Sequence, residues 1–269
     1  MKTIASRHNQ TVRRFRDLAD RPDPQGLRLL LDGAHLVREA MDVGFDFEQV
    51  CIASSHLDRD SEERTLAIAL EERGVAIVAA PDQLVAALSP VRTPSGIVAI
   101  ARRQQPMPGP EEILRCPAPM VLVGVDIQEP GNVGALLRVA EAAGATGVFV
   151  AGNSANPFSW KALRGSMGSG LRLPIVHGQS ASDVMRLLRT HDIRSIAAVA
   201  DGGSTPDDVR WTGKVAVVLG GEGPGLSDAV IAACDEQATI PMEAPVESLN
   251  VTVAAAILLY AARRPREAQ

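Results

Sequence analysis

Three stretches in the C-terminal half, rich in small and polar residues, carry the polar side chains that could do chemistry. In NVGALLR, Asn132 is placed to cap a helix, and Arg138 follows nearly two turns later. In LGGEGPGLS, four glycines surround Glu222, and backbone amides exposed in this way can hold a carboxylate, a phosphate or an adenine edge. In IPMEAPVESLNVTVA, a loop enters a helix near Asn250, with Ser248 or Asn250 available as its cap. Each stretch alone also fits an ordinary capped helix, turn or loop.

Several familiar kinds of active site are absent from the sequence. The glycine loop lacks the Lys of a phosphate-binding P-loop, and it is a poor match to a dinucleotide fingerprint. HExxH and GxSxG do not occur, which argues against a zinc hydrolase and a serine esterase. Glu222 has no second acid among the glycines, whereas a glycosidase needs a carboxylate pair. None of the histidines falls in the three stretches: His8, His35, His56, His177 and His191.

Alternating strand and helix patterns lead into these loops. Runs rich in Val, Ile and Ala predict six strands in the second half, namely MVLVGVD, GVFVAG, RLPIVHG, SIAAVA, KVAVVLGGEG and QATIPM. Helical spacing is predicted at about 132–143, 159–168, 182–191, 228–234 and 250–264. Because such apolar strands are buried on both faces, we expect a mainly parallel sheet covered by helices, with ligands at the carboxyl ends of its strands.

A proline-rich stretch divides the chain. Five prolines between residues 101 and 119 suit a linker better than a packed element, because proline locks φ and lacks an amide donor. We therefore predict a first domain at 1–104, a linker at 105–118 and a second domain at 119–269. The first domain alternates strands and helices as well, with strands in FEQVCIAS, GVAIVAA and SGIVAIARR and helices after Gly33 and near 61–73, so a small α/β unit is expected.

The charge distribution restricts how RNA could bind. The formal net charge is −5, so affinity for RNA must come from local basic patches. An aromatic content of 3% leaves too few rings for modules that stack several bases. The first sixteen residues contain no acid and form a local basic face from Lys2, Arg7, Arg13, Arg14 and Arg16. We expect the four arginines of this face to contact the RNA backbone.

Cysteine usage and apolar runs indicate the compartment. Cys51, Cys116 and Cys234 lie far apart without a CxxC pair, so neither a zinc site nor a disulfide framework is predicted. The N-terminus lacks the apolar core of a secretory signal, and the apolar stretch 253–262 is shorter than the roughly 20 residues of a membrane span. We expect a cytoplasmic protein that uses neither a metal nor a membrane.

Together and in this order, the three stretches resemble the motifs of the SpoU/TrmH family of RNA ribose 2′-O-methyltransferases in the SPOUT superfamily. The motifs are NVGALLR, LGGEGPGLS and IPMEAPVESLNVTVA, and the intervening ALRGSMGSGLRLPIV is also similar to the family's segment there. The resemblance covers essentially all of the predicted second domain. One difference is that Ala244 and Pro245 stand where the family commonly has a glycine two residues after the motif's methionine, Met242.

The resemblance implies a fold, a cofactor and an assembly. It implies an α/β SPOUT domain with a parallel sheet and a deep trefoil knot, preceded by a small ribosomal-protein-like α/β RNA-binding domain. S-adenosylmethionine would be bound in the knot, and proteins of this kind are usually homodimers with active sites formed between subunits. The predicted cofactor contacts are Gly220, Gly221, Ile240, Met242 and Leu249.

The resemblance also assigns roles to the polar residues. Arg138 would bind the phosphate beside the target ribose and stabilise the developing alkoxide, since a guanidinium is a poor base; a deprotonated arginine acting as base is the competing mechanism. Asn132 would orient Arg138 or the nucleotide. Glu222 would fix the glycine loop or a contact in the active site, and Ser248 and Asn250 would hydrogen-bond the substrate or shape the cofactor loop. Three further basic residues are candidates for phosphate contacts, with solvated surface charge as the alternative: Lys161, Arg164 and Arg172.

Alternatives for the function remain open at this point. The predicted activity is methylation of a ribose 2′-hydroxyl in structured RNA, with 23S-type rRNA favoured by the two-domain layout. A tRNA ribose methyltransferase is one alternative, and a non-catalytic RNA-binding protein of the same fold is another. Binding of S-adenosylmethionine separates the enzyme from the non-catalytic protein.

Overall fold

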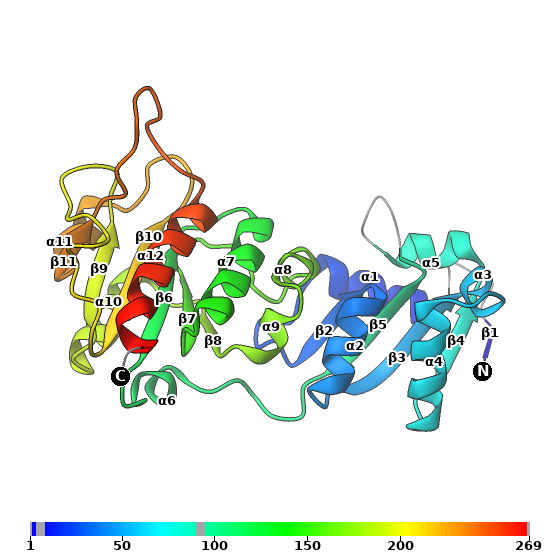
Figure 1. The fold of residues 1–269 in the computed structure, drawn as a ribbon. Helices are drawn as coiled ribbons and strands as arrows, with labels where there is room; N and C mark the ends of the chain where they lie inside the picture. Colours follow the sequence, from blue (N-terminus) through cyan, green and yellow to red (C-terminus); the bar gives the residue numbers. More distant parts are fainter. Residues whose placement is uncertain (1, 4–8, 90–94, 268–269) are drawn as a thin grey trace. The chain divides into compact units, whose positions relative to one another are not determined.

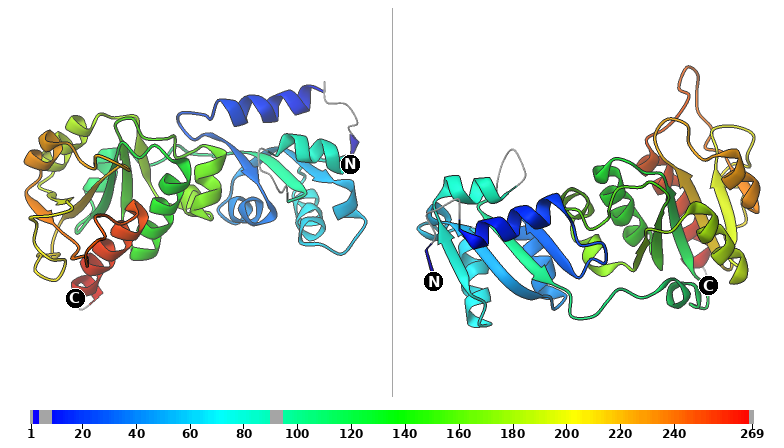
Figure 2. Two further views of the ribbon diagram at one scale, coloured as in Figure 1. Left: turned by 90° about the horizontal axis from the view of Figure 1, so that it is seen from above. Right: turned by 180° about the vertical axis from the view of Figure 1, so that it is seen from behind.

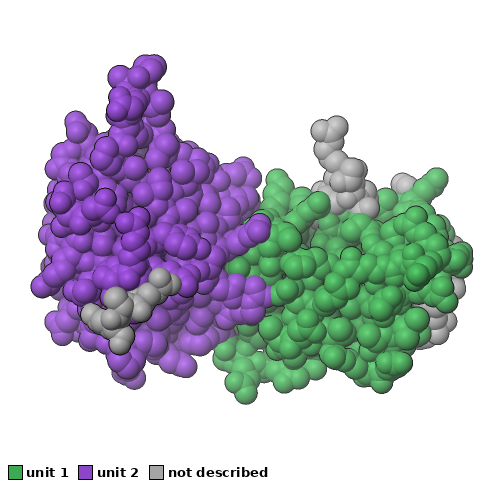
Figure 3. Space-filling model, viewed as in Figure 1, with its two compact units in different colours: residues 1–106, 158–171 green, residues 107–157, 172–269 purple. Residues whose placement is uncertain are grey.

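The structure is a computed structural model that describes residues 2–3, 9–89 and 95–267. Its elements are labelled in Figure 1. The chain forms two compact units, coloured separately in Figure 3: unit 1 contains residues 1–106 and 158–171, and unit 2 contains residues 107–157 and 172–269. Each unit is described by itself below.

Unit 2 is built on a parallel sheet. The strand order is β11-β9-β10-β6-β7-β8, and every pairing between neighbours is parallel. All residues of β6 and β7 are buried, as expected for strands covered on both faces. The predicted parallel sheet is therefore confirmed, and its strands are β6 (Met120–Val125), β7 (Gly147–Ala151), β8 (Ile175–His177), β9 (Arg194–Ala198), β10 (Val215–Gly220) and β11 (Glu236–Ala238).

Helices cover both faces of this sheet. Helices α7 (Pro130–Ala143) and α12 (Val251–Glu267) pack together on one face, and α10 (Ala181–Thr190) and α11 (Asp228–Ala233) pack on the other (Figure 2). On the α10 face, strand residues such as Val123 and Phe149 join Leu188 and Val230 in one apolar core. Burial of each such side chain contributes about 1.5–3 kcal/mol to folding. The stacked layers hold the strand ends, and therefore the loops, in place.

The proline-rich stretch contains a packed element. Residues 110–114 form α6 (Pro110–Leu114), which begins at a proline in its first turn, where the missing amide hydrogen is tolerated. Ile113 and Leu114 are buried in the same core as Phe149. The stretch is thus anchored to unit 2 rather than irregular throughout, because two apolar residues in it pack against the sheet.

Unit 1 has a mixed sheet with the order β1-β4-β3-β5-β2. Strands β1, β4 and β3 are parallel, while β5 runs antiparallel to both β3 and β2. The expected α/β unit is present. Its strands are β1 (Lys2–Thr3), β2 (Arg28–Asp32), β3 (Asp46–Ala53), β4 (Ile77–Ala80) and β5 (Ile97–Arg102), and its helices include α2 (Ala34–Asp42), α3 (Ser54–Leu57), α4 (Glu62–Glu72) and α5 (Asp82–Leu88).

The basic N-terminal stretch forms a helix that the charge analysis overlooked. Helix α1 (Gln10–Asp20) is capped by Asn9, whose side chain accepts a hydrogen bond from the Thr11 amide at 2.9 Å. Its buried residues Val12, Phe15 and Leu18 recur every three positions and pack on the sheet, with α5 beside them. Arg13, Arg14 and Arg16 of this helix are exposed on the other side, because a helix with one apolar stripe turns its remaining residues to solvent.

A short segment from the second half of the chain packs in unit 1. Residues 158–171 include α8 (Trp160–Ser166), and α9 (Ser169–Arg172) ends at the boundary between the units. Arg164 pairs with Asp32 at 3.3 Å, and His35 Nε2 lies 3.3 Å from the carbonyl oxygen of Met167. Unit 1 is therefore made from two separate parts of the sequence.

Candidate active site

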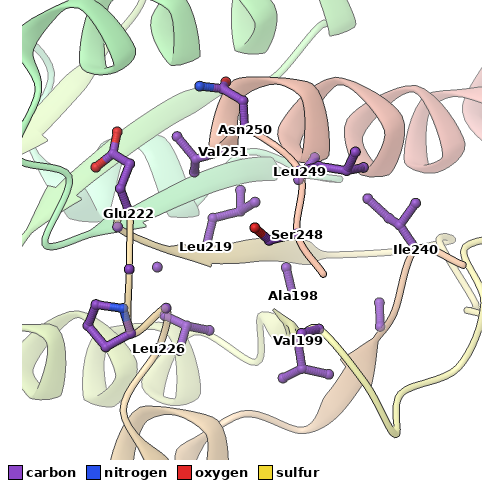
Figure 4. Close-up of a pocket in the computed structure, with 18 of the residues that line it drawn as sticks. Ala198, Val199, Leu219, Glu222, Leu226, Ile240, Ser248, Leu249, Asn250 and Val251 are labelled. Carbon is purple, nitrogen blue, oxygen red and sulfur yellow. The ribbon is translucent and has the colours of Figure 1, made fainter. Parts of the chain in front are cut away.

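A cavity of about 450 Å³ lies at the carboxyl ends of three neighbouring strands of unit 2. Strands β11, β9 and β10 stand side by side, and the residues after each of them contribute to its wall. Ligand sites in parallel sheets lie at this edge, because all the strands end there. Figure 4 shows Glu222 on one side of the cavity and Ile240 on the other. The lining comes from 198–200, 219–226, 238–242 and 248–254, together with Ile231.

The glycine loop after β10 requires its glycines for steric reasons. A Cβ on Gly220 would fall well inside contact distance of the Gly225 and Leu226 backbone, and one on Gly221 would overlap the carbonyl oxygen of Asp126. Gly223 and Gly225 have φ values of 97° and 68°, which L side chains rarely adopt. The cavity wall is therefore formed by glycine backbone that packs against neighbouring backbone more closely than a residue with a side chain would allow.

All five residues predicted to contact the cofactor line this cavity: Gly220, Gly221, Ile240, Met242 and Leu249. They come from three separate segments of the chain. The loop that carries Met242 leaves β11 and projects from the unit before it enters α12 (Figure 1). Within that loop the peptide bond between Ala244 and Pro245 is cis.

Polar residues from all three motifs meet beside the cavity. Asn132 Nδ2 donates a hydrogen bond to Glu222 Oε1, and Asn250 Nδ2 donates to Asn132 Oδ1 at 3.4 Å. Asn250 Oδ1 also accepts a hydrogen bond from the Thr252 amide at 2.9 Å, which caps α12 as predicted. Ser227 caps α11 in the same way, since its side chain accepts a hydrogen bond from the Val230 amide. Asn132 therefore links Glu222 and Asn250 through two hydrogen bonds.

The prediction that Asn132 caps α7 is wrong. The helix begins two residues earlier, at Pro130, and its cap is Glu129, whose side chain accepts from the Gly131 amide at 3.4 Å. Proline suits this first position because no helical partner is needed for its nitrogen. Asn132 is thus within the first turn, where its side chain can cross to Glu222 instead of binding its own helix.

Arg138 does not lie with the other predicted catalytic residues. Asn250, Glu222 and Ser248 line the cavity of the chain that carries them, but Arg138 does not. It is exposed on α7, and its side chain makes no hydrogen bond or ion pair with any described residue. A side chain in this state is available to a ligand or to another molecule.

The structure places the predicted RNA-contacting residues in different settings. Arg13, Arg14 and Arg16 are exposed on α1, whereas Arg7 lies outside the described residues. Arg164 pairs with Asp32, and Arg172 forms a two-pronged ion pair with Glu141 in which both bonds are 2.8 Å long. Lys161 lies over the Trp160 ring, 5.6 Å from its centre. Their contact with phosphate stays a prediction.

Two contributors to the site escaped the sequence analysis. Ala198, Val199 and Ala200 line the cavity, although nothing in their type suggests a site. Their position at the end of a predicted strand was the available signal, but it points to the cavity only once β9 is known to neighbour β10 and β11. Asp126 directly follows β6, and its carbonyl oxygen faces Gly221.

The part of the chain that the structure describes contains neither a candidate metal site nor a candidate membrane span. No three His, Cys, Asp or Glu side chains there are grouped closely enough to hold a metal ion. No described helix combines the length and apolarity needed to span a bilayer.

Comparison with known proteins identifies the family. The family model "SpoU rRNA Methylase family" matches residues 119–260, more than half of the chain and all of the segments that form the cavity. The chain belongs to the SpoU rRNA methylase family. It is therefore an RNA methyltransferase by membership, and its α/β fold with a parallel sheet agrees with that of SPOUT methyltransferases.

Two proteins named as RNA methyltransferases match nearly the whole chain. An uncharacterized tRNA/rRNA methyltransferase, slr1673, of Synechocystis is 31% identical over 97% of this chain and 93% of its own length. The 23S rRNA (guanosine(2553)-2′-O)-methyltransferase RlmP of Bacillus subtilis is 28% identical over 97% of this chain and 98% of its own length. The resemblance therefore extends through unit 1 as well as the methylase region.

Solved structures agree along the same extent. The crystal structure of an RNA 2′-O ribose methyltransferase has a TM-score of 0.83 and 31% identity, covering 98% of this chain and 99% of that one. The SpoU methyltransferase AviRb from Streptomyces viridochromogenes, solved in complex with AdoMet, has a TM-score of 0.82 and 26% identity, covering 97% and 99%.

Proposed function

We propose that this protein transfers a methyl group from S-adenosylmethionine to a ribose 2′-hydroxyl in ribosomal RNA. The observation that carries the proposal is the meeting of Asn132, Glu222 and Asn250, one from each motif, beside a glycine-walled cavity. The named Bacillus subtilis relative, a 23S rRNA 2′-O-methyltransferase, matches both parts of the chain and favours rRNA over tRNA.

The cavity fits S-adenosylmethionine in size and in chemistry. Its volume of about 450 Å³ is within the range of small-molecule sites, roughly 300–1,000 Å³. Val199, Ile240 and Leu249 supply apolar surface, and the backbone of the glycine loop supplies polar groups at close range. The AviRb complex, in which the related protein binds AdoMet, supports this choice of cofactor.

The chain's own residues then have a limited task. The bound sulfonium supplies an activated methyl group, so the protein must mainly align the hydroxyl and ease its loss of a proton. The hydrogen bonds through Asn132 hold Glu222 and Asn250 in fixed positions where they can orient the ribose. We assign Arg138 the phosphate contact and stabilisation of the developing alkoxide.

Arg138 would perform this task in the active site of a second copy. It is exposed and does not line the cavity of its own chain, so a role in transfer requires a homodimer with shared sites. Helix α12 supports such an assembly, because Val253, Ile257 and Tyr260 expose 47%, 37% and 45% of their surfaces at helical spacing. A threaded C-terminal segment forming a trefoil knot is part of the same proposal.

RNA capture is assigned to the exposed arginines of α1 in unit 1, with residues 1–104 as the RNA-binding domain and 119–269 as the catalytic one. Arg13, Arg14 and Arg16 make no ion pair with any described residue, so their charge is available to phosphate. Lys161, Arg164 and Arg172 would add secondary contacts once their present partners exchange. We place the reaction in the cytoplasm, in agreement with three free cysteines.

Calorimetry with S-adenosylmethionine, followed by mapping of ribose methylation in rRNA from cells with and without the protein, tests the proposed activity. We expect micromolar binding and one 2′-O-methylated position that depends on the protein. RNA binding without cofactor binding would instead support the non-catalytic alternative. Arg138→Ala is expected to lower kcat about 100- to 1,000-fold while cofactor affinity is kept.

Mixing two inactive variants tests the shared site. Arg138→Ala keeps its cavity, and Gly221→Ala is expected to lose cofactor binding but keep its arginine. In a mixed dimer the intact cavity faces the partner's intact arginine, so random mixing should restore about a quarter of wild-type activity. If Arg138 instead serves its own chain, the mixture stays inactive and the shared-site proposal is wrong.

A further inference from the structure

Asp126 holds an unusual backbone conformation at the end of β6. Its φ is 57°, in the left-handed region that aspartate tolerates better than most side chains. Its amide donates to the carbonyl of Ala151 at 3.1 Å, and its Oδ1 accepts from the amide of Asn153 at 2.7 Å. The residue is thus held by its backbone to the last residue of β7 and by its side chain to the segment that follows β7.

The next residue is bound to the same segment. The amide of Ile127 donates to Ser154 Oγ at 2.9 Å, and that hydroxyl donates to the Ala151 carbonyl at 2.6 Å. The Ile127 carbonyl accepts from the amide of Ala155 at 2.8 Å, and the Ile127 side chain is fully buried. The turn from β6 towards α7 therefore has its direction set by hydrogen bonds outside its own strand and helix.

Asp126 also packs against the glycine loop. A Cβ on Gly221 would overlap the Asp126 carbonyl oxygen, and one on Gly152 would overlap Asp126 Oδ1. Asp126 itself does not line the cavity. It stands between two glycines, one in the cavity wall and one in the segment after β7, with no room for a side chain on either.

We propose that Asp126 is a positioning residue for methyl transfer. By fixing the direction in which the chain enters α7, it places Asn132 against Glu222, and its carbonyl sets the position of Gly221 in the cavity wall. This inference rests on the proposed function, because it concerns the geometry of that site. It assigns a role to a residue outside the three motifs.

Three substitutions separate the parts of this role. Asp126→Gly keeps the backbone conformation but removes the acceptor, so we expect kcat to fall about 10- to 100-fold, since a misplacement of about 1 Å can cost 100-fold. The KM for RNA should change less than about threefold, and the calorimetric Kd for S-adenosylmethionine should rise by about three- to tenfold. Asp126→Asn keeps an oxygen acceptor and should retain at least about a third of the wild-type kcat. Ser154→Ala should lower kcat by less than Asp126→Gly.

Asp192 offers a matched control. It is a second exposed aspartate in unit 2 with a left-handed backbone, at φ 55°, in the turn after α10 and outside the cavity lining. Asp192→Gly should leave kcat and the cofactor Kd unchanged, and thermal unfolding of each variant reports whether it folds.

The outcomes distinguish a failure of the proposed function from a failure of the positioning role of Asp126. A wild-type protein that binds no S-adenosylmethionine would remove the proposed function itself. With an active wild type, an unchanged kcat and Kd in Asp126→Gly would overturn the positioning role. Equal losses in Asp126→Gly and Asp192→Gly would overturn it too, since they would show a general loss of fold, and failure of Asp126→Asn to restore kcat would exclude the hydrogen bond as its basis.

Discussion

Two aspartates that close buried strands have opposite surroundings in the two units. Asp32 ends β2 in unit 1 and is buried; its carboxylate accepts hydrogen bonds from Ser89 Oγ at 3.1 Å and Arg164 at 3.3 Å. Burial raises the pKa of Asp32 above its usual value, although Ser89 and Arg164 act against the rise. Asp126 follows β6 in unit 2, is exposed and accepts from a backbone amide.

Sheet topology explains the difference. In unit 1, β5 runs antiparallel to both of its neighbours, so β2 and the strand beside it end at opposite edges, and the polar end of β2 is satisfied within the unit. In unit 2 all six strands are parallel, and their carboxyl ends converge on one edge. An aspartate at a strand end therefore has a structural role in the mixed sheet of unit 1, whereas in the parallel sheet of unit 2 it lies next to the cavity wall.

Substitutions in the two apolar cores are expected to have the largest effects, and their effects on cofactor binding should differ between the two units. Phe15 in unit 1 and Phe149 in unit 2 are fully buried. Replacing either by alanine should lower the free energy of unfolding by about 3–5 kcal/mol, because a large cavity is left. Under conditions where both variants remain folded, calorimetry should show weakened cofactor binding only for Phe149→Ala. Equal weakening in both would show that the units are not separable in this way.

Glycines near the two strand ends give a smaller and more local contrast. Gly221→Ala should weaken binding of S-adenosylmethionine at least about 100-fold, since its Cβ would overlap the Asp126 backbone. Gly33→Ala has room, with Ser95 Oγ 3.4 Å from the new Cβ, and meets only the strain of φ 105°. It should therefore lower stability by about 1–2 kcal/mol and leave cofactor affinity unchanged. Calorimetry and urea unfolding of both variants measure the difference.

The pH dependence of stability tests the environment of Asp32. A raised pKa in the folded state means that folding favours the protonated carboxyl, so this contribution is fully present below about pH 3.8, the ordinary value, and is lost as pH rises through the raised pKa. Asp32→Asn should remove this decline, which urea unfolding between pH 3 and 7 detects. Asp126→Asn is the matched comparison. An unchanged pH profile for Asp32→Asn would mean that the carboxyl is not desolvated.

Thiol labelling of Cys51 is expected to show the smallest effect, and it tests the packing of unit 1. Cys51 is fully buried in β3, and burial raises its pKa to about 12, so at pH 8 the thiol is both protonated and shielded. Iodoacetamide should modify it only as fast as unit 1 opens, and Phe15→Ala should accelerate the reaction. Rapid labelling in the unsubstituted protein would contradict the packing described here.

Local features were predictable because they depend on residues close together in the chain. Apolar runs predicted all six strands of unit 2, and the three motifs indicated both the residues of the cavity wall and the family. Charge alone was a poor guide at the N-terminus, where the stripe of Val12, Phe15 and Leu18 makes α1 an ordinary amphipathic helix with its arginines outward. The cap of α7 was misplaced because Glu129 and Pro130 suit the start of a helix better than Asn132.

What the amino-acid sequence determined by itself was therefore the elements, the glycine loops and the set of reactive residue types. Only the tertiary structure decided that Asn132 reaches Glu222, that residues 158–171 pack in unit 1, and that Arg138 stays away from its own chain's cavity. The physical reason is that hydrophobic period and backbone preference act over a few residues, whereas strand order and close packing bring together residues about a hundred positions apart.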